Sequence, residues 1–450
     1  MSKDEYLITD APLKALTVFA MPMILGSFFQ QIYNMADSII VGQFVGSSAL
    51  AAVGACAALT NVFICVALGA GVGAGVLVSR YFGARDYGKM KTIVSTSLIS
   101  FLVLSILLGI FGFCFSHSMM SLLQTPPDIL DEAVLYLRVY FVGFPFLFMY
   151  NILSTMFTSI GESRIPLVLL IFSSVLNIFL DILFIVPFHM GVAGAAWATI
   201  LSQFLSAVLS LVVGLKNFPI LHLHREDFTD LKDTAVLHLK TGFPMGFQMS
   251  VMCIGQLAMQ AVVNSLGTAA VAGYTAASKA DQLSVLVNNA MMTAISNYVA
   301  QNFGAGRWDR IRQGVRACLI QTEAFNLIMC IGILLLRHPI VRMFLSDPTK
   351  EIYHYSDMYL TIVAPFYFVL GLLAVYRTSI QSMQNGKAPF AACMIELVMR
   401  IAATVGLSGI IGYTSVCIAS PMAWIGACSL LIPVYYKMMK GNCAALLRTE

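Results

Sequence analysis

The sequence predicts an all-α polytopic membrane protein whose twelve transmembrane helices form two six-helix bundles. Three observations support this fold class: an apolar composition, twelve segments of membrane-spanning length, and an internal repeat. Hydrophobic residues make up 59% of the 450 positions and charged residues 11%, whereas a soluble domain carries about 25% charged residues. The composition excludes a soluble globular protein, and no basic, aromatic-interleaved patch predicts nucleic-acid binding.

Twelve apolar segments are long enough to cross a bilayer, which requires about 20 helical residues. We place them at residues 15–40, 51–78, 93–117, 134–158, 165–188, 192–215, 241–264, 270–299, 317–336, 354–381, 388–410 and 415–436. The first segment is too long for the hydrophobic region of a cleavable signal peptide, so we expect it to remain as a span.

The basic residues indicate how these spans are oriented. If both termini are cytoplasmic, nineteen of the 26 Lys and Arg residues fall in cytoplasmic segments, three in external segments and four within spans. Cytoplasmic loops of membrane proteins carry an excess of Lys and Arg. We therefore expect both termini in the cytoplasm and an even number of spans.

The chain repeats itself at an offset of about 221–223 residues. The matching pairs are Ala20-Met-Pro22-Met with Gly242-Phe-Pro244-Met, SALAAVG (48–54) with AAVAGYT (269–275), YFGARDYGKM (81–90) with NFGAGRWDRI (302–311), and SIGESRIP (159–166) with SMQNGKAP (382–389). Six spans in each half give the halves the same orientation, related by a parallel pseudo-twofold axis. We predict a six-helix half at 1–215, a cytoplasmic linker at 216–240, and a second six-helix half with a short tail at 241–450.

Two aspartates lie within the predicted spans of the first half. Asp37 follows an otherwise uncharged stretch, and Asp181 lies in a segment whose other polar residues are Ser173, Ser174 and Asn177. Ionisable residues inside a membrane are costly and mark ion paths, proton relays or substrate sites. Hydrogen bonding between helices contributes about 0.6 kcal/mol per pair. Such bonding explains single polar residues better than it explains two aspartates.

The helical spacing gives each aspartate polar neighbours. Gln30 and Tyr33 share a helix face with Asp37, and Ser174 and Asn177 share a face with Asp181.

In the sixth span Thr199 and Gln203 are four residues apart. Oxygen-rich faces on three spans suit Na⁺, whereas two neighbouring carboxyls suit H⁺. Pro22, in the span of Asp37, can bend or hinge that helix.

The second half does not repeat this pattern, since the counterparts of Asp37 and Asp181 lie near Met259 and Thr404. Its own charged residues within spans are Lys279, Asp281, Arg377, Glu396 and Arg400. Glu396 and Arg400 can pair along one helix face. Pairing of Asp281 with Arg377, or of Lys279 with Glu396, is equally compatible with the sequence.

No cofactor or energy-rich nucleotide is implied by the sequence. The Gly-rich segment VALGAGVGAG lacks the ending of a phosphate-binding loop. The ten cysteines have no metal-ligand spacing, and no catalytic triad predicts an enzyme. Energy for transport must then come from an ion gradient, with H⁺ or Na⁺ as the coupling ion.

The chain closely resembles the multidrug and toxic compound extrusion (MATE) family along its whole length. The resemblance rests on YNMADSIIVGQFVGSSALAAVG (33–54), SIGESRIP (159–166), SSVLNIFLDILFI (173–185) and HMGVAGAAWATILSQ (189–203). The Asn177-Ile-Phe-Leu-Asp181 element and Asp37 resemble the prokaryotic DinF-like branch. The resemblance implies a V-shaped central cavity and an antiporter that exports amphipathic, often cationic drugs in exchange for Na⁺ or H⁺.

In that branch the ion site lies on the first, fifth and sixth spans. The matching positions here are Asp37, Asn177, Asp181 and Thr199, which could also hold Na⁺. Positions that match the nearby substrate cavity are Gln30, Tyr33, Asn151 and Ser174, to which we add Gln203 from its spacing. Ser154 departs from the family pattern, in which Asn is common. Another branch uses acidic residues in the seventh and tenth spans, where this chain has Gln248, Gln256 and Thr378.

The resemblance also implies a monomer in a bacterial or archaeal cytoplasmic (inner) membrane, with small drug-like substrates and membrane lipid as its partners. The alternative function is a flippase for lipids or lipid-linked saccharides, from the same superfamily. Such proteins often have fourteen spans and a cavity rich in Arg and Lys. The twelve spans and few intramembrane cations of this chain favour the drug exporter.

Overall fold

The computed structural model describes residues 5–123, 125–218, 222, 225–228, 231–344 and 349–446. Across these residues the chain is helical and contains no β-strand, which confirms the all-α prediction. The chain folds into two compact units. We name Met1–Glu5 with Met21–Gly246 the N-terminal lobe, and Tyr6–Ala20 with Phe247–Glu450 the C-terminal lobe.

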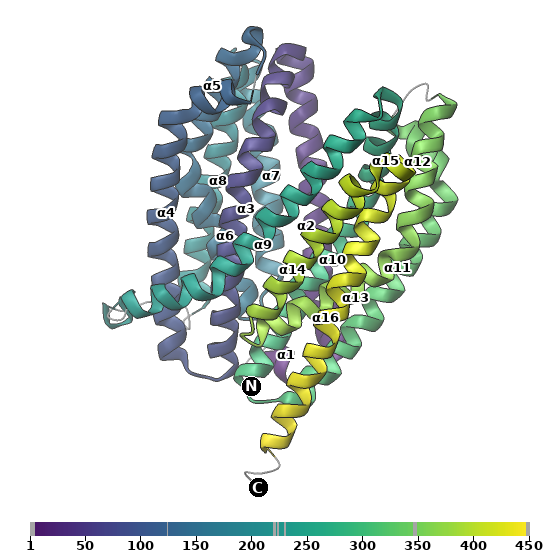
Figure 1. Ribbon diagram of the computed structural model, residues 1–450. Coiled ribbons are helices and arrows are strands. Elements are labelled where there is room, and N and C mark those ends of the chain that lie inside the picture. Colours follow the sequence, from purple (N-terminus) through teal and green to yellow (C-terminus); the bar gives the residue numbers. More distant parts are fainter. Residues whose placement is uncertain are drawn as a thin grey trace. The chain divides into compact units, whose positions relative to one another are not determined.

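The N-terminal lobe is a bundle of long helices. Its elements are α2 (Pro12–Ile40) from Met21 onward, η2 (Val41–Val45), α3 (Ser47–Gly83), α4 (Tyr87–Leu122), α5 (Pro127–Val142), α6 (Phe144–Ser159), α7 (Arg164–Ile185), α8 (Gly191–Asn217), η4 (Arg225–Phe228) and the beginning of α9 (Leu231–Ser265). Within this lobe α7 packs against α8, and α4 packs against α5 and α6 (Figure 1).

The C-terminal lobe has the same kind of architecture. Its elements are α1 (Tyr6–Thr9), the beginning of α2, the rest of α9, α10 (Thr268–Gly304), α11 (Trp308–Phe344), α12 (Lys350–Val363), η5 (Ala364–Phe366), α13 (Tyr367–Ser382), α14 (Lys387–Ile401), η6 (Ala402–Gly406), α15 (Ser408–Ile411) and α16 (Thr414–Leu446). In this lobe α14 packs on α16, and α10 packs on α11, α12 and α13 (Figure 1).

Each of the twelve predicted spans overlaps one helix or a run of two or three consecutive helical elements. Among the described residues, nine helical segments are long and apolar enough to cross a membrane, and the bent pair α5 and α6 makes a tenth. The other two predicted spans lie on α3 and α10, which are 37 residues long each. The predicted polytopic arrangement therefore agrees with the helices that the structure contains.

The bend of 50° between α5 and α6 has a local cause. Gly143 separates the two helices, and Pro145 follows in the first turn of α6, where proline is tolerated but cannot continue the preceding helix. A Cβ atom on Gly143 would lie 2.3 Å from Cγ1 of Ile200 in α8. The glycine thus allows the bend to approach α8 closely.

Two helices are shared between the lobes. Pro22 lies inside α2 and Pro244 inside α9. The division between the lobes falls just before Met21 in α2 and just after Gly246 in α9. Proline inside a helix removes one main-chain hydrogen bond and permits bending. In both helices the point of possible flexure coincides with the change of lobe.

The predicted division into residues 1–215, a linker at 216–240, and 241–450 differs from this arrangement. Helix α9 begins at Leu231, so the last part of the predicted linker is helical. The sequence alone did not show that the beginning of α2 packs with the second lobe. Residues 219–221, 223–224 and 229–230 of the predicted linker, and 447–450 of the predicted tail, lie outside the described residues.

Polar side chains attach the beginning of the chain to the C-terminal lobe. Arg310 Nη2 donates a hydrogen bond to the main-chain oxygen of Asp10 at 2.6 Å, and Asn302 Nδ2 donates to that of Leu7 at 3.0 Å. Arg310 Nε also donates to Asn302 Oδ1 at 3.1 Å. Carbonyl groups at the end of a helix lack partners within that helix. Arg310 and Asn302 therefore explain why Tyr6–Ala20 belongs to this lobe.

We expect Gly273→Ala to destabilise the C-terminal lobe. A Cβ atom at this position in α10 would lie 2.8 Å from both the carbonyl oxygen of Ile352 and Cβ of Tyr355 in α12. Overpacking of this kind costs about 1–3 kcal/mol, so the melting temperature in detergent should fall. Gly332→Ala is the matched control, because nothing lies within 4 Å of its added Cβ. Equal melting temperatures for the two variants would contradict this packing.

Candidate functional site

Three helices of the N-terminal lobe bring together the residues predicted for ion coupling. Helix α2 carries Tyr33 and Asp37, α7 carries Asn177 and Asp181, and α8 carries Thr199. The side chain of Asp181 is 0% exposed and that of Asn177 is 1% exposed. Residues from distant parts of the chain thus meet in one site, because α7 packs along α8 and α2 reaches both through its second half.

The centre of the site is a pair of carboxyl groups. The carboxyl groups of Asp37 and Asp181 lie close enough to interact directly. The Oδ1 atoms of both aspartates are buried and have no hydrogen-bond partner among the described residues. Two carboxylates in contact repel each other, so the pair requires a shared proton or a bound cation. The Oδ1 atoms without partners can accept a proton or coordinate a cation.

An amide and a hydroxyl complete one side of the pair. Asn177 Nδ2 lies 3.4 Å from Thr199 Oγ1. If the Asn177 amide is rotated by a half-turn, its nitrogen donates to Asp181 Oδ2 at 2.8 Å instead. Thr199 Oγ1 donates to the main-chain oxygen of Ala195 at 3.1 Å, which leaves its lone pairs free to accept. Asn177 therefore fixes the Asp181 carboxyl, and Thr199 supplies a further oxygen.

Tyrosine hydroxyls cover the other side. The Tyr33 side chain forms a hydrogen bond with Thr199 and interacts electrostatically with Asp37, Asp181 and Tyr140. Tyr136, one turn before Tyr140 in α5, also interacts with Asp37 and Tyr33. The rings of Tyr136 and Tyr140 stack with centroids 6.0 Å apart.

The sequence interpretation missed Tyr136 and Tyr140. The available signal was the pair of tyrosines four residues apart in an apolar span, a spacing that places both on one helix face. This spacing alone does not predict a functional site, because aromatic residues at this spacing usually belong to a packed core.

Other predicted cavity residues have no hydrogen bond to the carboxyl pair among the described residues. Gln30 is exposed on α2, and Asn151 donates from Nδ2 to the main-chain oxygen of Leu147 in its own helix at 2.8 Å. Ser174 is buried one turn before Asn177. Gln203 has a buried Oε1 atom without a partner. These four residues remain candidates for substrate contact and do not form the coupling centre.

The charged residues of the C-terminal lobe are arranged differently from the three pairings suggested for them. Arg377 of α13 forms an ion pair with Glu396 of α14, and their side chains are 12% and 5% exposed. Glu396 therefore does not take Arg400 as its partner, although the two are one turn apart. Lys279 is exposed, and Asp281 keeps a buried Oδ1 atom without a hydrogen-bond partner.

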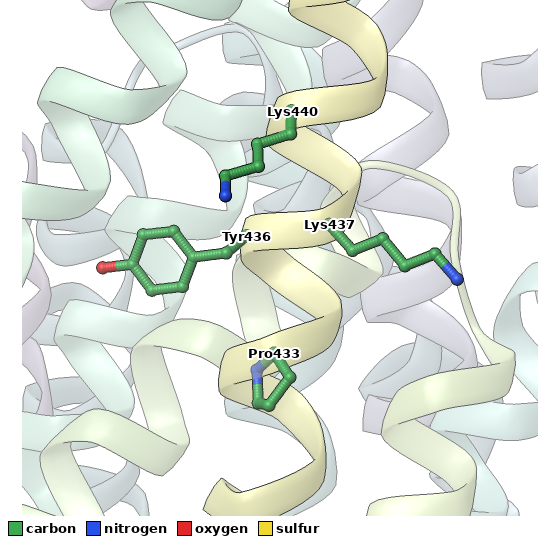
Figure 2. A pocket seen from close by; sticks show the side chains of 4 residues that line it. All are labelled: Pro433, Tyr436, Lys437 and Lys440. Atoms are coloured by element: carbon green, nitrogen blue, oxygen red, sulfur yellow. The ribbon is translucent and has the colours of Figure 1, made fainter.

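A surface pocket on α16 has a different chemical character. It is lined by Pro433, Tyr436, Lys437 and Lys440 (Figure 2). Tyr436 and Lys440 point to one side of the helix and Lys437 to the other. Aromatic and basic residues are typical of the cytoplasmic interface of a span. The pocket has no carboxyl group in its lining and is no candidate for cation coupling.

No group of three or more His, Cys, Asp and Glu side chains suited to a metal ion occurs within the described part of the chain. The coupling site offers two carboxyls, one amide and hydroxyl groups. Such oxygen donors suit a proton or a hard monovalent cation better than a transition metal.

Comparison with known proteins identifies the family. The MatE family model matches residues 22–183 and 244–405, one stretch in each half of the chain. The chain belongs to the MatE family. The double match also supports the internal repeat, because both stretches are matched by the same model. The family prediction is thereby confirmed.

Relatives of this MatE protein share most of its length. The probable multidrug resistance protein YpnP of Bacillus subtilis (strain 168) is 30% identical over 97% of this chain and 94% of its own. The probable multidrug resistance protein YoeA of the same strain is 26% identical over 80% and 78%. The multidrug export protein MepA of Staphylococcus aureus (strain MSSA476) is 24% identical over 91% and 92%.

Solved structures share the fold of this MatE protein. An outward-facing multidrug resistance MATE family transporter of the MOP superfamily superposes with a TM-score of 0.91 at 22% identity, over 98% of this chain and 99% of the other. A MOP superfamily transporter from Pyrococcus furiosus Vc1 (DSM3638) gives the same TM-score, identity and coverage. At this level of identity the likeness establishes the fold.

We expect Thr199→Val to reduce drug efflux from membrane vesicles at least several-fold, because valine keeps the shape of threonine but removes the hydroxyl next to Asn177 and Tyr33. Thr199→Ser should retain most of the efflux. Ser210→Ala in the same helix is the control, since the Ser210 hydroxyl donates to the main-chain oxygen of Ser206 in its own helix at 2.7 Å. Equal efflux by Thr199→Val and Ser210→Ala would remove Thr199 from the site.

Proposed function

We propose that this protein is a cation-coupled multidrug efflux antiporter of a bacterial or archaeal cytoplasmic membrane, with both termini in the cytoplasm. The observation that carries the proposal is the contact between Asp37 and Asp181 in apolar helices. Membership of the MatE family, and relatives named as multidrug resistance and export proteins, support the drug-efflux part. The substrates are small amphipathic, often cationic compounds, and the transporter acts as a monomer.

A proton is the coupling ion that the site favours. The two carboxyls lie close to each other, and carboxyl groups at such a distance repel unless one of them holds a proton. Na⁺ would instead separate the carboxylates and take oxygens from Asn177 and Thr199. Either ion draws on the membrane potential, which supplies about 2.3 kcal/mol per charge per 100 mV.

Exchange follows from competition for negative charge. When the carboxyl pair of Asp37 and Asp181 is empty, its charge attracts a cationic drug. When the pair holds a proton or Na⁺, that attraction is lost and the drug leaves. A ligand shifts a conformational equilibrium only by its difference in affinity for the two states. Coupling therefore requires that drug and ion stabilise different access states.

Helix α2 provides a means of linking the two states. Pro22 lies fifteen residues before Asp37 in the same helix, a distance of about 22 Å along its axis. Flexure at this proline would move Tyr33 and Asp37 relative to α7, where Asp181 is buried. The five-residue π-helix η2, which begins four residues after Asp37, is a second irregularity in this span.

We expect Asp37→Asn and Asp181→Asn each to abolish ethidium efflux, because either change removes the paired charge that binds the cation. The measurement is ethidium efflux from vesicles with H⁺ and Na⁺ gradients imposed separately. Asp128→Asn, at an exposed position in the first turn of α5, is the matched control.

Loss of efflux in both site variants, with normal melting temperature and normal efflux by the control, is the outcome that the proposal requires. Full efflux by both site variants would refute the coupling site. If a Na⁺ gradient drives efflux without a pH gradient, the coupling ion at this site is Na⁺ and not a proton.

We expect Pro22→Ala to slow efflux several-fold while binding of ethidium persists, because the straightened α2 changes state more slowly. Pro339→Ala is the control, since Pro339 also lies inside a helix but in α11. Efflux rates and ethidium affinity should be measured on the same preparations. If Pro22→Ala matches Pro339→Ala in rate, α2 does not hinge at this proline.

A further inference from the structure

Every residue of the coupling site has a counterpart in the C-terminal lobe, because the lobes carry equivalent helices. Three pairs of landmarks set the correspondence: Pro22 and Pro244 inside α2 and α9, Arg164 and Lys387 at the beginnings of α7 and α14, and Gly191 and Gly412. These glycines have left-handed φ of 57° and 55° and lie at the first residue of α8 and two residues before α16. They pair Tyr33 with Gly255, Asp37 with Met259, Asn177 with Arg400, Asp181 with Thr404, and Thr199 with Ser420.

The counterparts also lie together within their own lobe. Ser420 Oγ lies 3.7 Å from Met259 Sδ, although 161 residues separate them in the chain. A Cβ atom on Gly255 would lie 3.0 Å from Cδ and 3.2 Å from Nη1 of Arg400. Gly255 thus leaves the space in which the Arg400 guanidinium lies against α9, whereas the equivalent position in the N-terminal lobe carries the Tyr33 side chain.

The charge of this second site is the reverse of the first. None of the five counterparts is acidic, and one of them, Arg400, is a permanent cation. Its side chain is 6% exposed, and its Nε atom has no hydrogen-bond partner among the described residues. Glu396, one turn before Arg400 in α14, forms its ion pair with Arg377.

Other groups act on Arg400 only at longer range. Asp281, Tyr274 and Tyr359 of α10 and α12 interact with it electrostatically, and Arg377 repels it. No described carboxylate lies within 4.0 Å of its guanidinium. A buried, uncompensated charge is costly and needs a reason to persist.

We propose that Arg400 is a tethered cation. Its guanidinium lies beside Gly255, the counterpart of Tyr33, and supplies to the C-terminal lobe the positive charge that the exchangeable ion supplies to Asp37 and Asp181 in the N-terminal lobe. A second ion is repelled from this lobe, so each transport cycle is coupled through one site. Arg400 is thus a specificity-determining residue for ion stoichiometry, an inference that rests on the proposed coupling function of the N-terminal lobe.

The role of Arg400 can be tested by placing an acid at Met259, the position equivalent to Asp37. Met259→Asp should lower the melting temperature of the purified full-length protein only slightly, because Arg400 neutralises the new carboxylate. When Arg400 is replaced by Met, Met259→Asp should lower the melting temperature strongly. When Arg400 is replaced by Lys, Met259→Asp should lower the melting temperature only slightly, as it does with Arg400 present. Met252→Asp, at an exposed position of α9, is the control and should not depend on residue 400.

The exclusion of an ion can be tested on the same proteins. In Arg400→Met with Met259→Asp, an external cation should replace the guanidinium. Replacing choline chloride by NaCl, or lowering the pH, should then recover the melting temperature. Sodium-22 binding or proton release should rise from one ion per protein to two. If the double variant does not fold, Thr404→Asp can replace Met259→Asp. It should lower the melting temperature slightly with Arg400 present and strongly with Arg400→Met.

Two results would overturn the inference: an equal loss of melting temperature by Met259→Asp with and without Arg400, or no additional ion in the double variant. Adding Asp37→Asn separates this inference from the proposed function. If the Asp37→Asn variant binds as many ions as the wild-type protein, the proposed coupling site in the N-terminal lobe is wrong. The effect of Arg400 on the melting temperature of Met259→Asp is measured on purified protein and does not involve transport.

Discussion

Two carboxyl groups in contact inside an apolar lobe cannot both remain charged unless a cation lies with them. Asp37 and Asp181 place this constraint at the centre of the N-terminal lobe. Asn177 fixes the Asp181 carboxyl, and the hydroxyls of Thr199 and Tyr33 surround the pair. None of the described groups that act on Asp37 and Asp181 carries a positive charge, so in the proposed function the cation comes from solution.

The helices around the carboxyl pair are irregular at several points. Pro22 interrupts the hydrogen bonding of α2, and the π-helix η2 follows Asp37 by four residues. Gly143 allows a sharp bend between α5 and α6, and α5 contributes Tyr136 and Tyr140 to the site. Regular helices resist deformation, whereas proline, glycine and π-turns supply defined places for it.

The repeat preserves backbone geometry while the chemistry of the two lobes has diverged. Glycines with a left-handed φ lie at the first residue of α8 and two residues before α16, and prolines lie inside α2 and α9 at equivalent positions. The side chains that these backbones place together are acidic in one lobe and include Arg400 in the other. A duplicated scaffold can therefore hold one exchangeable charge and one permanent charge. Under the proposed function, such a division makes the coupling asymmetric between two lobes of similar architecture.

The sequence by itself determined the fold class, the number of span positions and the residues of the carboxyl site. Those features follow from hydropathy, from the helical spacing around Asp37 and Asp181, and from a family resemblance that covers the whole chain. The tertiary structure decided which helices share a lobe and which charges form pairs. It joined Glu396 to Arg377 and added Tyr136 and Tyr140 to the site. Spacing along one helix fixes only a face, whereas a partner on another helix depends on packing between helices.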